Sequence, residues 1–206
     1  MRSASHRVAW KYSRRQKERG MTLRVIAGKA KGRKLKSVPG DTTRPITDRV
    51  KEALFNIIAG DILESNWWDV FAGTGAVGIE ALSRGASFVR FSDSNRAPIE
   101  TIKSNVEHCG FKSQSEIRRG DAFTLLASPP DRRFEYIYIA PPQYKEMWGT
   151  ALELVDENID WLTDDGWVIA QIDPKEYKSL VFENLEEFEQ RRYGSTLLVF
   201  YESKDQ

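Results

Sequence analysis

Short apolar runs and longer amphipathic stretches alternate along most of this chain. Apolar residues recur at helical spacing from Val50 to Ile58, which predicts an amphipathic helix over 48–59 capped by Thr47. This alternation predicts a mostly parallel, doubly wound α/β sheet with helices on both faces. The predicted strands lie near 67–71, 88–92, 115–119, 134–139, 166–172 and 195–201. Further helices are predicted near 76–84, 95–109, 121–127 and 146–158.

The two ends of the chain depart from this alternation. Residues 23–28 predict a short strand, and the basic, glycine-punctuated residues 29–35 predict its continuation as a hairpin. Near the other end, residues 185–192 and 196–201 flank Gly194 and predict an antiparallel hairpin at the edge of the sheet. We therefore predict three parts, which are a basic arm over 1–20 that we expect to be disordered, a basic hairpin extension over 21–46 and the main domain over 47–206.

Composition narrows the class of protein. A length of 206 residues fits one domain with a short appendage, and an apolar content of 40% predicts a globular body. No apolar run approaches the length of a membrane span, so we expect no membrane partner. Cys109 is the single cysteine, and with His6 and His108 as the only histidines we expect neither a disulfide framework nor a metal site. We expect Cys109 to pack near a helix end and the protein to be a monomer.

Charge is distributed unevenly along the chain. Residues 1–52 hold 16 Lys and Arg against 4 Asp and Glu, a net of +12, whereas residues 53–206 hold 15 against 26, a net of −11. A basic arm on an acidic body predicts phosphate contacts with a nucleic acid, and the competing interpretation is a solvated tail. The candidate phosphate-binding residues are Arg24, Lys29, Lys31, Arg33, Lys34, Arg44 and Arg49, with Arg14, Arg15 and Lys17 in the arm.

A strand end, a glycine turn and a helix start are predicted by the run Asp69-Val70-Phe71-Ala72-Gly73-Thr74-Gly75-Ala76-Val77-Gly78. Ligands of an open parallel sheet bind past the carboxyl ends of its strands, where Gly73 and Gly75 would allow a tight turn and Gly78 a close packing of helix on strand. The glycines also match the dinucleotide pattern, but a carboxylate at Asp69 would repel a phosphate and hold a cationic amino group. The run therefore favours S-adenosylmethionine as cofactor and methyl transfer as reaction.

Two further acids follow the next two predicted strands. Asp93 is placed to accept hydrogen bonds from ribose hydroxyls, and the run Gly120-Asp121-Ala122 offers an acid and a backbone amide for the adenine edge. Either acid could instead be a helix cap. The predicted cofactor-binding residues are Asp69, Phe71, Gly73, Gly75, Gly78, Asp93, Ser94, Asp121 and Ala122.

Two prolines end the fourth predicted strand. Prolines cannot extend the hydrogen-bond ladder of a sheet, so they stiffen the chain that leaves the carboxyl end of this strand, here called the rim. They also leave carbonyls there that can accept hydrogen bonds from an exocyclic amine. Tyr144 could stack on a flat base, and the alternative is a rigid loop with a core-facing tyrosine. The predicted catalytic segment is Ala140-Pro141-Pro142-Gln143-Tyr144.

From about Leu23 to Tyr201 the chain resembles the bacterial 16S rRNA (guanine-N2) methyltransferases of the RsmD type. The matching blocks are Arg24-Val25-Ile26-Ala27-Gly28, Gly32-Arg33-Lys34-Leu35, the run from Arg44 to Asn56, the run from Asp69 to Ala86, Arg192-Tyr193-Gly194 and Thr196-Leu197. The resemblance implies a class I S-adenosylmethionine-dependent methyltransferase fold. It also implies cofactor roles for Asp69, Gly73, Gly75, Asp93 and Asp121, and a helix start at Thr47-Asp48-Arg49 that closes over cofactor or RNA.

The resemblance further implies small-subunit rRNA as substrate, within an assembled ribosomal particle in the cytoplasm, or in an organelle stroma if the arm is a targeting segment. The family has Asp-Pro-Pro-Tyr at the fourth strand, where this chain has Ala140-Pro141-Pro142-Gln143. We expect an active methyltransferase, in which the Gln143 amide or rim carbonyls stand in for the carboxylate. The alternatives are a silent S-adenosylmethionine- and RNA-binding assembly factor, a nicotinamide-dependent oxidoreductase and a small-molecule methyltransferase.

Overall fold

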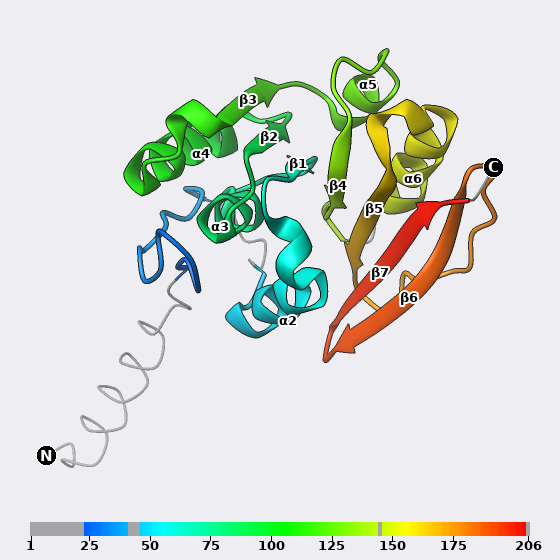
Figure 1. The fold of residues 1–206 in the computed structure, drawn as a ribbon, viewed down its shortest axis with the longest axis horizontal. Coiled ribbons are helices and arrows are strands. Elements are labelled where there is room, and N and C mark those ends of the chain that lie inside the picture. Colours follow the sequence, from blue (N-terminus) through cyan, green and yellow to red (C-terminus); the bar gives the residue numbers. More distant parts are fainter. Residues whose placement is uncertain (1–22, 41–45, 144–145, 205–206) are drawn as a thin grey trace, which may run out of the picture.

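The described residues, 23–40, 46–143 and 146–204 of a computed structural model, form a seven-stranded sheet with the order β3-β2-β1-β4-β5-β7-β6 (Figure 1). The first five strands pair in parallel, β7 is antiparallel to β5, and β6 is antiparallel to β7, as the predicted edge hairpin requires. The strands are β1 (Asn66–Asp69), β2 (Phe88–Asp93), β3 (Ser115–Arg119), β4 (Phe134–Ile139), β5 (Leu162–Ile172), β6 (Leu185–Tyr193) and β7 (Thr196–Ser203).

Helices cover both faces of the sheet, as the alternation predicts. Thr47 caps α2 by accepting a hydrogen bond from Val50 N at 3.3 Å, and Cys109 ends α4 with its side chain buried, both as expected. The helices are α2 (Asp48–Ile58), α3 (Ala76–Arg84), α4 (Arg96–Cys109), α5 (Ala122–Leu126) and α6 (Met147–Glu157). Short 3-10 helices are η1 (Ala59–Ile62), η2 (Lys112–Gln114) and η3 (Ile159–Trp161).

Two neighbouring tryptophans of β1 mark the two halves of the core. Because successive strand residues point to opposite faces, Trp67 packs with the α2, α3 and α4 side and Trp68 with the α5 and α6 side. Trp67 stacks on Phe55 of α2 with ring centroids 5.5 Å apart, and Trp68 lies 4.7 Å from the ring of Trp161. Both tryptophans are fully buried.

The N-terminal segment, residues 23–38, forms less of a hairpin than predicted. One antiparallel bridge joins Arg24 to Lys34, with backbone hydrogen bonds from Val25 N to Arg33 O and from Leu35 N to Leu23 O on either side of it, and residues 23–28 are not a strand. The physical reason is that the pairing stops after Val25, because Ile26 N and Ala27 N donate instead to the Glu80 carboxylate of α3 at 2.8 and 2.9 Å. Sequence periodicity does not reveal such competition for backbone hydrogen bonds.

Several predicted features lie outside the described residues, namely the arm over 1–20 with Arg14, Arg15 and Lys17, and also Arg44 and Tyr144. The division at residues 20 and 46 stays a prediction. Within the described ranges, no helix combines the length and the apolar character needed to cross a membrane.

Candidate functional site

The strand order reverses between β1 and β4, so the switch point of the sheet lies beside the glycine turn. Gly73 and Gly75 have φ angles of +53° and +76°, which allow the chain to turn sharply between β1 and α3. A Cβ on Gly78 would lie 2.4 Å from the Phe91 ring, so this glycine permits close packing of α3 on β2, as predicted. A Cβ on Gly73 would meet nothing within 4 Å, so open space lies beside the turn.

Asp69 ends β1 with its carboxylate buried under the start of α3. Only 2% of the residue is exposed, and its Oδ2 accepts a hydrogen bond from Gly78 N at 3.2 Å. Burial, with a smaller contribution from nearby Asp93 and against the hydrogen bond from Gly78, raises the pKa of Asp69 to about 7. A cation in contact would stabilise the ionised form. A buried acid beside an open turn therefore fits the ammonium end of S-adenosylmethionine.

Asp93 ends β2 next to the same turn. Its Oδ2 accepts from Gly73 N at 3.2 Å and its Oδ1 from Asn95 N at 2.9 Å, so this acid holds the glycine turn against the adjacent strand. Ser94 follows it on the surface. The arrangement brings Asp69, the turn and Asp93 together at one edge of the sheet, as the sequence predicts.

Asp121 caps α5, which was the alternative to a cofactor contact for this residue. Its Oδ1 accepts from Thr124 N at 3.0 Å and from the Thr124 hydroxyl at 3.2 Å, at the start of α5. Ala122 is buried, and the half-buried Phe71 contacts Phe123 edge to face at 6.3 Å. The part of α5 nearest the turn thus presents apolar side chains, and a cofactor contact by Asp121 stays a prediction.

The predicted catalytic segment leaves the sheet directly after β4. Ala140 and Pro141 are partly buried, whereas Pro142 and Gln143 are exposed. Ala140 packs against the core on the α3 side, the side on which Asp69 lies. The segment therefore leaves the sheet at the carboxyl ends of the strands, as the glycine turn does.

The predicted phosphate-binding residues that the structure describes all lie on its surface. Arg24 forms an ion pair with Asp48 at 2.9 Å, and Arg33 donates to the backbone carbonyl of His108. The remaining predicted residues, which are also exposed, are Lys29, Lys31, Lys34 and Arg49.

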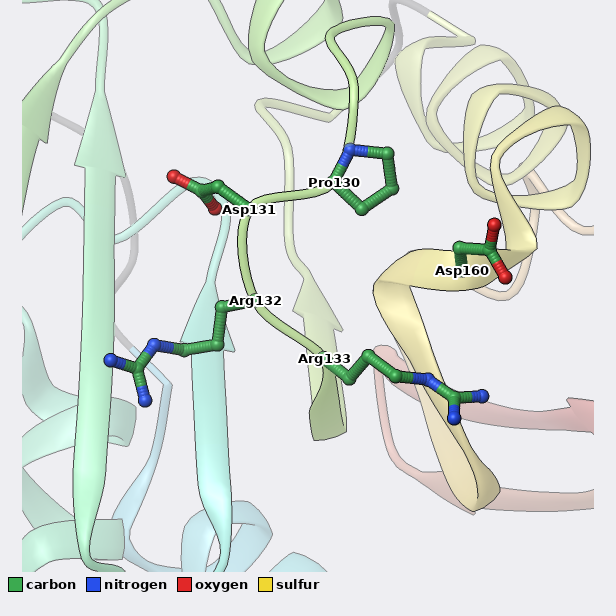
Figure 2. Close-up of a pocket in the computed structure, with 5 residues that line it drawn as sticks. All are labelled: Pro130, Asp131, Arg132, Arg133 and Asp160. Carbon is green, nitrogen blue, oxygen red and sulfur yellow. The ribbon is translucent and has the colours of Figure 1, made fainter.

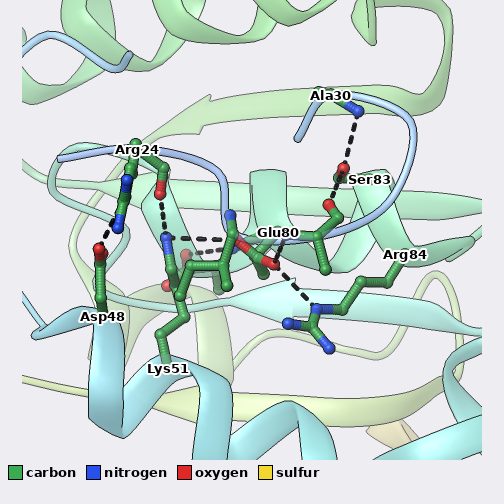
Figure 3. A network of polar contacts seen from close by, with 11 residues as sticks. Arg24, Ala30, Asp48, Lys51, Glu80, Ser83 and Arg84 are labelled. Carbon is green, nitrogen blue, oxygen red and sulfur yellow. Dashed lines mark hydrogen bonds and ion pairs between the residues drawn. The ribbon is translucent and has the colours of Figure 1, made fainter. Parts of the chain in front are cut away.

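A buried ion-pair network, which the sequence did not predict, joins this basic segment to α2 and α3 (Figure 3). Lys51 of α2 and Glu80 of α3 are both fully buried, with Nζ 3.3 Å from Oε2, and Lys51 also donates to the Arg24 carbonyl at 2.6 Å. Glu80 accepts from Arg84 as well, at 2.8 Å. One signal was available, because Lys51 lies three residues before Leu54 and four before Phe55, on the apolar face of the helix.

A separate surface pocket lies at the amino-terminal ends of the parallel strands, away from the glycine turn (Figure 2). It is lined by Pro130, Asp131, Arg132, Arg133 and Asp160, around the amino-terminal ends of β4 and β5. Asp131 is paired with Arg90 at 2.8 Å, and Arg133 with Asp164 at 2.6 Å. These charges are largely neutralised within the protein, and the predicted site residues are elsewhere.

Comparisons with known proteins agree with this geometry. A family model described as Conserved hypothetical protein 95 matches residues 23–202. YlbH of Bacillus subtilis is 35% identical over 184 residues, which covers 88% of this chain and 100% of YlbH. Ribosomal RNA small subunit methyltransferase D of Haemophilus influenzae is 33% identical, over 72% of this chain and 78% of that protein. The solved structure of yhhF from Escherichia coli superposes with a TM-score of 0.80 at 28% identity, covering 90% of this chain and 99% of yhhF. The predicted class I fold is confirmed.

Proposed function

The chain belongs to the family described as Conserved hypothetical protein 95, the RsmD-type methyltransferases, and on that premise we propose that it methylates the exocyclic N2 amine of a guanine in small-subunit rRNA. One observation carries the proposal. The buried Asp69, the open glycine turn and the segment from Ala140 meet at one edge of the sheet, at its switch point. This arrangement supports a site for an amino-acid-bearing nucleoside beside the backbone carbonyls that follow β4.

S-adenosylmethionine, when bound, supplies a methyl group on a positively charged sulfur. Asp69 would accept from its ammonium group and Asp93 from its ribose hydroxyls. The guanine amine is a poor nucleophile because its lone pair is delocalised into the ring. Carbonyls at Ala140 and Pro141 would accept from this amine and turn the lone pair toward the methyl group, and such positioning supplies several kcal/mol.

The proposed step needs no strong base before transfer. The nitrogen lone pair forms the new N–C bond while the electron pair of the S–C bond stays with sulfur. The amine proton becomes acidic only as this bond forms and can then pass to water or to an accepting oxygen at the rim. The missing carboxylate at position 140 therefore slows the reaction rather than forbids it.

Ala140 nevertheless favours a second candidate, a protein of this fold that binds cofactor and rRNA during small-subunit assembly without turnover. To separate the two, methyl incorporation should be measured on naked 16S rRNA and on small subunits that lack the modification. We expect incorporation, with assembled subunits as the better substrate. Intact cofactor binding without incorporation into either substrate would leave the assembly factor as the function.

Two substitutions test the chemistry of the rim. Gln143→Ala is expected to lower kcat about tenfold, because the exposed amide oxygen accepts the amine hydrogen bond in place of the family carboxylate. Ala140→Asp is expected to raise kcat, since it restores that carboxylate. Single-turnover methylation assays measure both, with Gln114→Ala at the opposite edge as matched control. An unchanged rate in Gln143→Ala would remove the role of the amide.

The basic surface of the N-terminal segment is predicted to bind RNA phosphates. In the triple variant Lys29→Glu, Lys31→Glu, Lys34→Glu, we expect a large decrease in rRNA affinity. The slope of log K against log salt should fall by about one for each phosphate that the variant no longer neutralises. Filter binding over a range of salt concentrations measures both quantities.

The matched control reverses three exposed lysines elsewhere, Lys103, Lys112 and Lys175, so that net charge changes equally. If both triple variants weaken binding to the same extent, only overall charge matters and the N-terminal surface has no specific role.

A further inference from the structure

Gln171 lies beside the rim position where the family carboxylate is absent. In the parallel pairing of β4 with β5, Tyr138 is level with Ile169 and Ile139 with Ala170. If this register is continued by one residue beyond the ends of the paired region, Gln171 lies alongside Ala140. Alternation along each strand places both residues on the α3 side of the sheet, together with Tyr138. A polar side chain of the neighbouring strand thus adjoins Ala140.

Tyr138 orients the amide of Gln171. The Tyr138 hydroxyl, Oη, donates a hydrogen bond to Gln171 Oε1 at 2.7 Å. Burial, with the nearby Asp69 carboxylate adding to it, raises the pKa of Tyr138 well above its ordinary value, so the hydroxyl keeps its proton and remains a donor. Because Oε1 accepts this bond, the Gln171 NH₂ group points away from Tyr138. Among the described residues nothing accepts a hydrogen bond from that nitrogen, Nε2.

The same row of residues leads to the cofactor side of the site. Asp69 on β1 is level with Tyr138 on β4, so Tyr138 lies between the buried carboxylate and Gln171. An acceptor base must lie close to the cofactor to receive a methyl group. Gln171 is partly exposed at this edge, so its amide can reach a base that enters there.

The two sides of the rim offer complementary hydrogen-bonding groups. The backbone carbonyls after β4 accept hydrogen bonds, which suits the amine of guanine. They cannot serve the ring nitrogens and carbonyl oxygen of the base, which are acceptors themselves and need a donor. Gln171 presents an NH₂ donor on the adjacent strand, and the hydrogen bond from Tyr138 fixes its direction.

We propose that Gln171 reads the acceptor guanine by donating from Nε2 to an acceptor atom of the base, and that Tyr138 is a positioning residue which fixes that amide. This inference rests on the proposed function and adds a residue that determines base specificity. A base that presents a donor at the same place would leave two donors facing each other, and the site would reject it.

The test uses Gln171→Leu, Gln171→Glu and Tyr138→Phe in the full chain, with assembled small subunits lacking the methyl group as substrate. Both Gln171 variants remove the donor, and we expect kcat/KM for the subunits to fall about ten- to hundredfold. Tyr138→Phe retains the amide but frees its orientation, so a smaller fall of about tenfold is expected. Cofactor affinity measured by calorimetry should stay within about twofold of wild type in all three variants.

Matched controls are Tyr136→Phe, two residues earlier on the same face of β4, and Gln114→Leu at the opposite edge. Both should leave kcat/KM within about twofold. Thermal unfolding of each variant distinguishes a damaged fold from a missing hydrogen bond to the base, since a structural role alone would lower the midpoint and cofactor affinity together.

The outcomes distinguish this inference from its premise. If wild type methylates guanine N2, as shown by mass-spectrometric mapping of the rRNA, but Gln171→Leu is equally active, the inference on Gln171 is overturned and the proposed function stands. If wild type methylates nothing, or another atom, the proposed function is overturned and the inference with it.

Discussion

Replacing Asp69 by asparagine is expected to abolish binding of S-adenosylmethionine and, without cofactor, to stabilise the protein at pH 8. The variant loses the negative charge that the ammonium group would contact in a buried place. Burial raises the pKa of Asp69 from 3.8 to about 7. At pH 8 the folded protein therefore contains an ionised carboxylate in a buried position, which is unfavourable. A shift of that size corresponds to about 4 kcal/mol of folding free energy, which asparagine would recover.

The sign of the pH dependence follows from the same shift. The pKa of Asp69 is near 4 in the unfolded chain and about 7 in the folded protein. The free energy of unfolding is therefore highest below pH 4 with respect to this group, and it falls as the pH rises toward about 7. The difference in stability between wild type and Asp69→Asn should therefore be small at pH 4 and largest at pH 8. Cofactor affinity of wild type should show the opposite trend and weaken below about pH 7, by up to tenfold per pH unit.

Calorimetric titration and thermal unfolding across this pH range measure both effects, with Asp160→Asn on the surface as control. Normal cofactor affinity in Asp69→Asn would show that the acid of β1 does not hold the ammonium group.

The second large effect is expected from Glu80→Ala, which should lower stability by about 3–5 kcal/mol, because it leaves the fully buried ammonium group of Lys51 without its counter-ion. The same change leaves the backbone donors of Ile26 and Ala27 without an acceptor. Burial already lowers the pKa of Lys51, against the attraction of Glu80, so removing Glu80 favours the neutral amine further. The expected fall in the unfolding midpoint is about 10 °C.

Hydrogen exchange gives a local readout of the same change. The amides of Ile26 and Ala27 should lose protection in Glu80→Ala, and rRNA affinity should fall, because the basic segment would lose two of its hydrogen bonds to α3. Glu100→Ala, on the exposed face of α4, is the matched control. Unchanged protection in Glu80→Ala would mean that the hydrogen bonds to Ser83 and the apolar contacts hold the segment without Glu80.

Local sequence patterns predicted the regular elements well, because each pattern has a local physical cause. Thr47 caps α2 because its side chain reaches Val50 N three residues on. A Cβ at position 78 would collide with the ring of Phe91 where α3 packs on β2. The pattern of three glycines predicted this close packing of helix on strand. The edge hairpin followed from Gly194, whose φ of +63° suits a tight turn between β6 and β7.

Other features arise from residues far apart in sequence, and no local pattern carried them. The predicted strand over 23–28 does not extend past Val25 because Glu80, more than 50 positions away, accepts the hydrogen bonds of Ile26 N and Ala27 N. Arg90 lies in an apolar strand, where an unpaired charge would be unfavourable. In the structure it contacts the rings of Trp68, Phe134 and Trp161 and pairs with Glu116 and Asp131.

The sequence alone determined the order of elements, the glycine turn with its acid, and the basic N-terminal region, since periodicity, turn chemistry and charge are properties of neighbouring residues. Only the tertiary structure decided that Asp69 is buried enough to shift its pKa, that Lys51 and Glu80 form a buried pair, and that Gln171 lies beside Ala140. Each of these depends on the register between strands or on packing between helices. Register and packing bring together residues that are 29 or more positions apart, and they arise only when the whole sheet has formed.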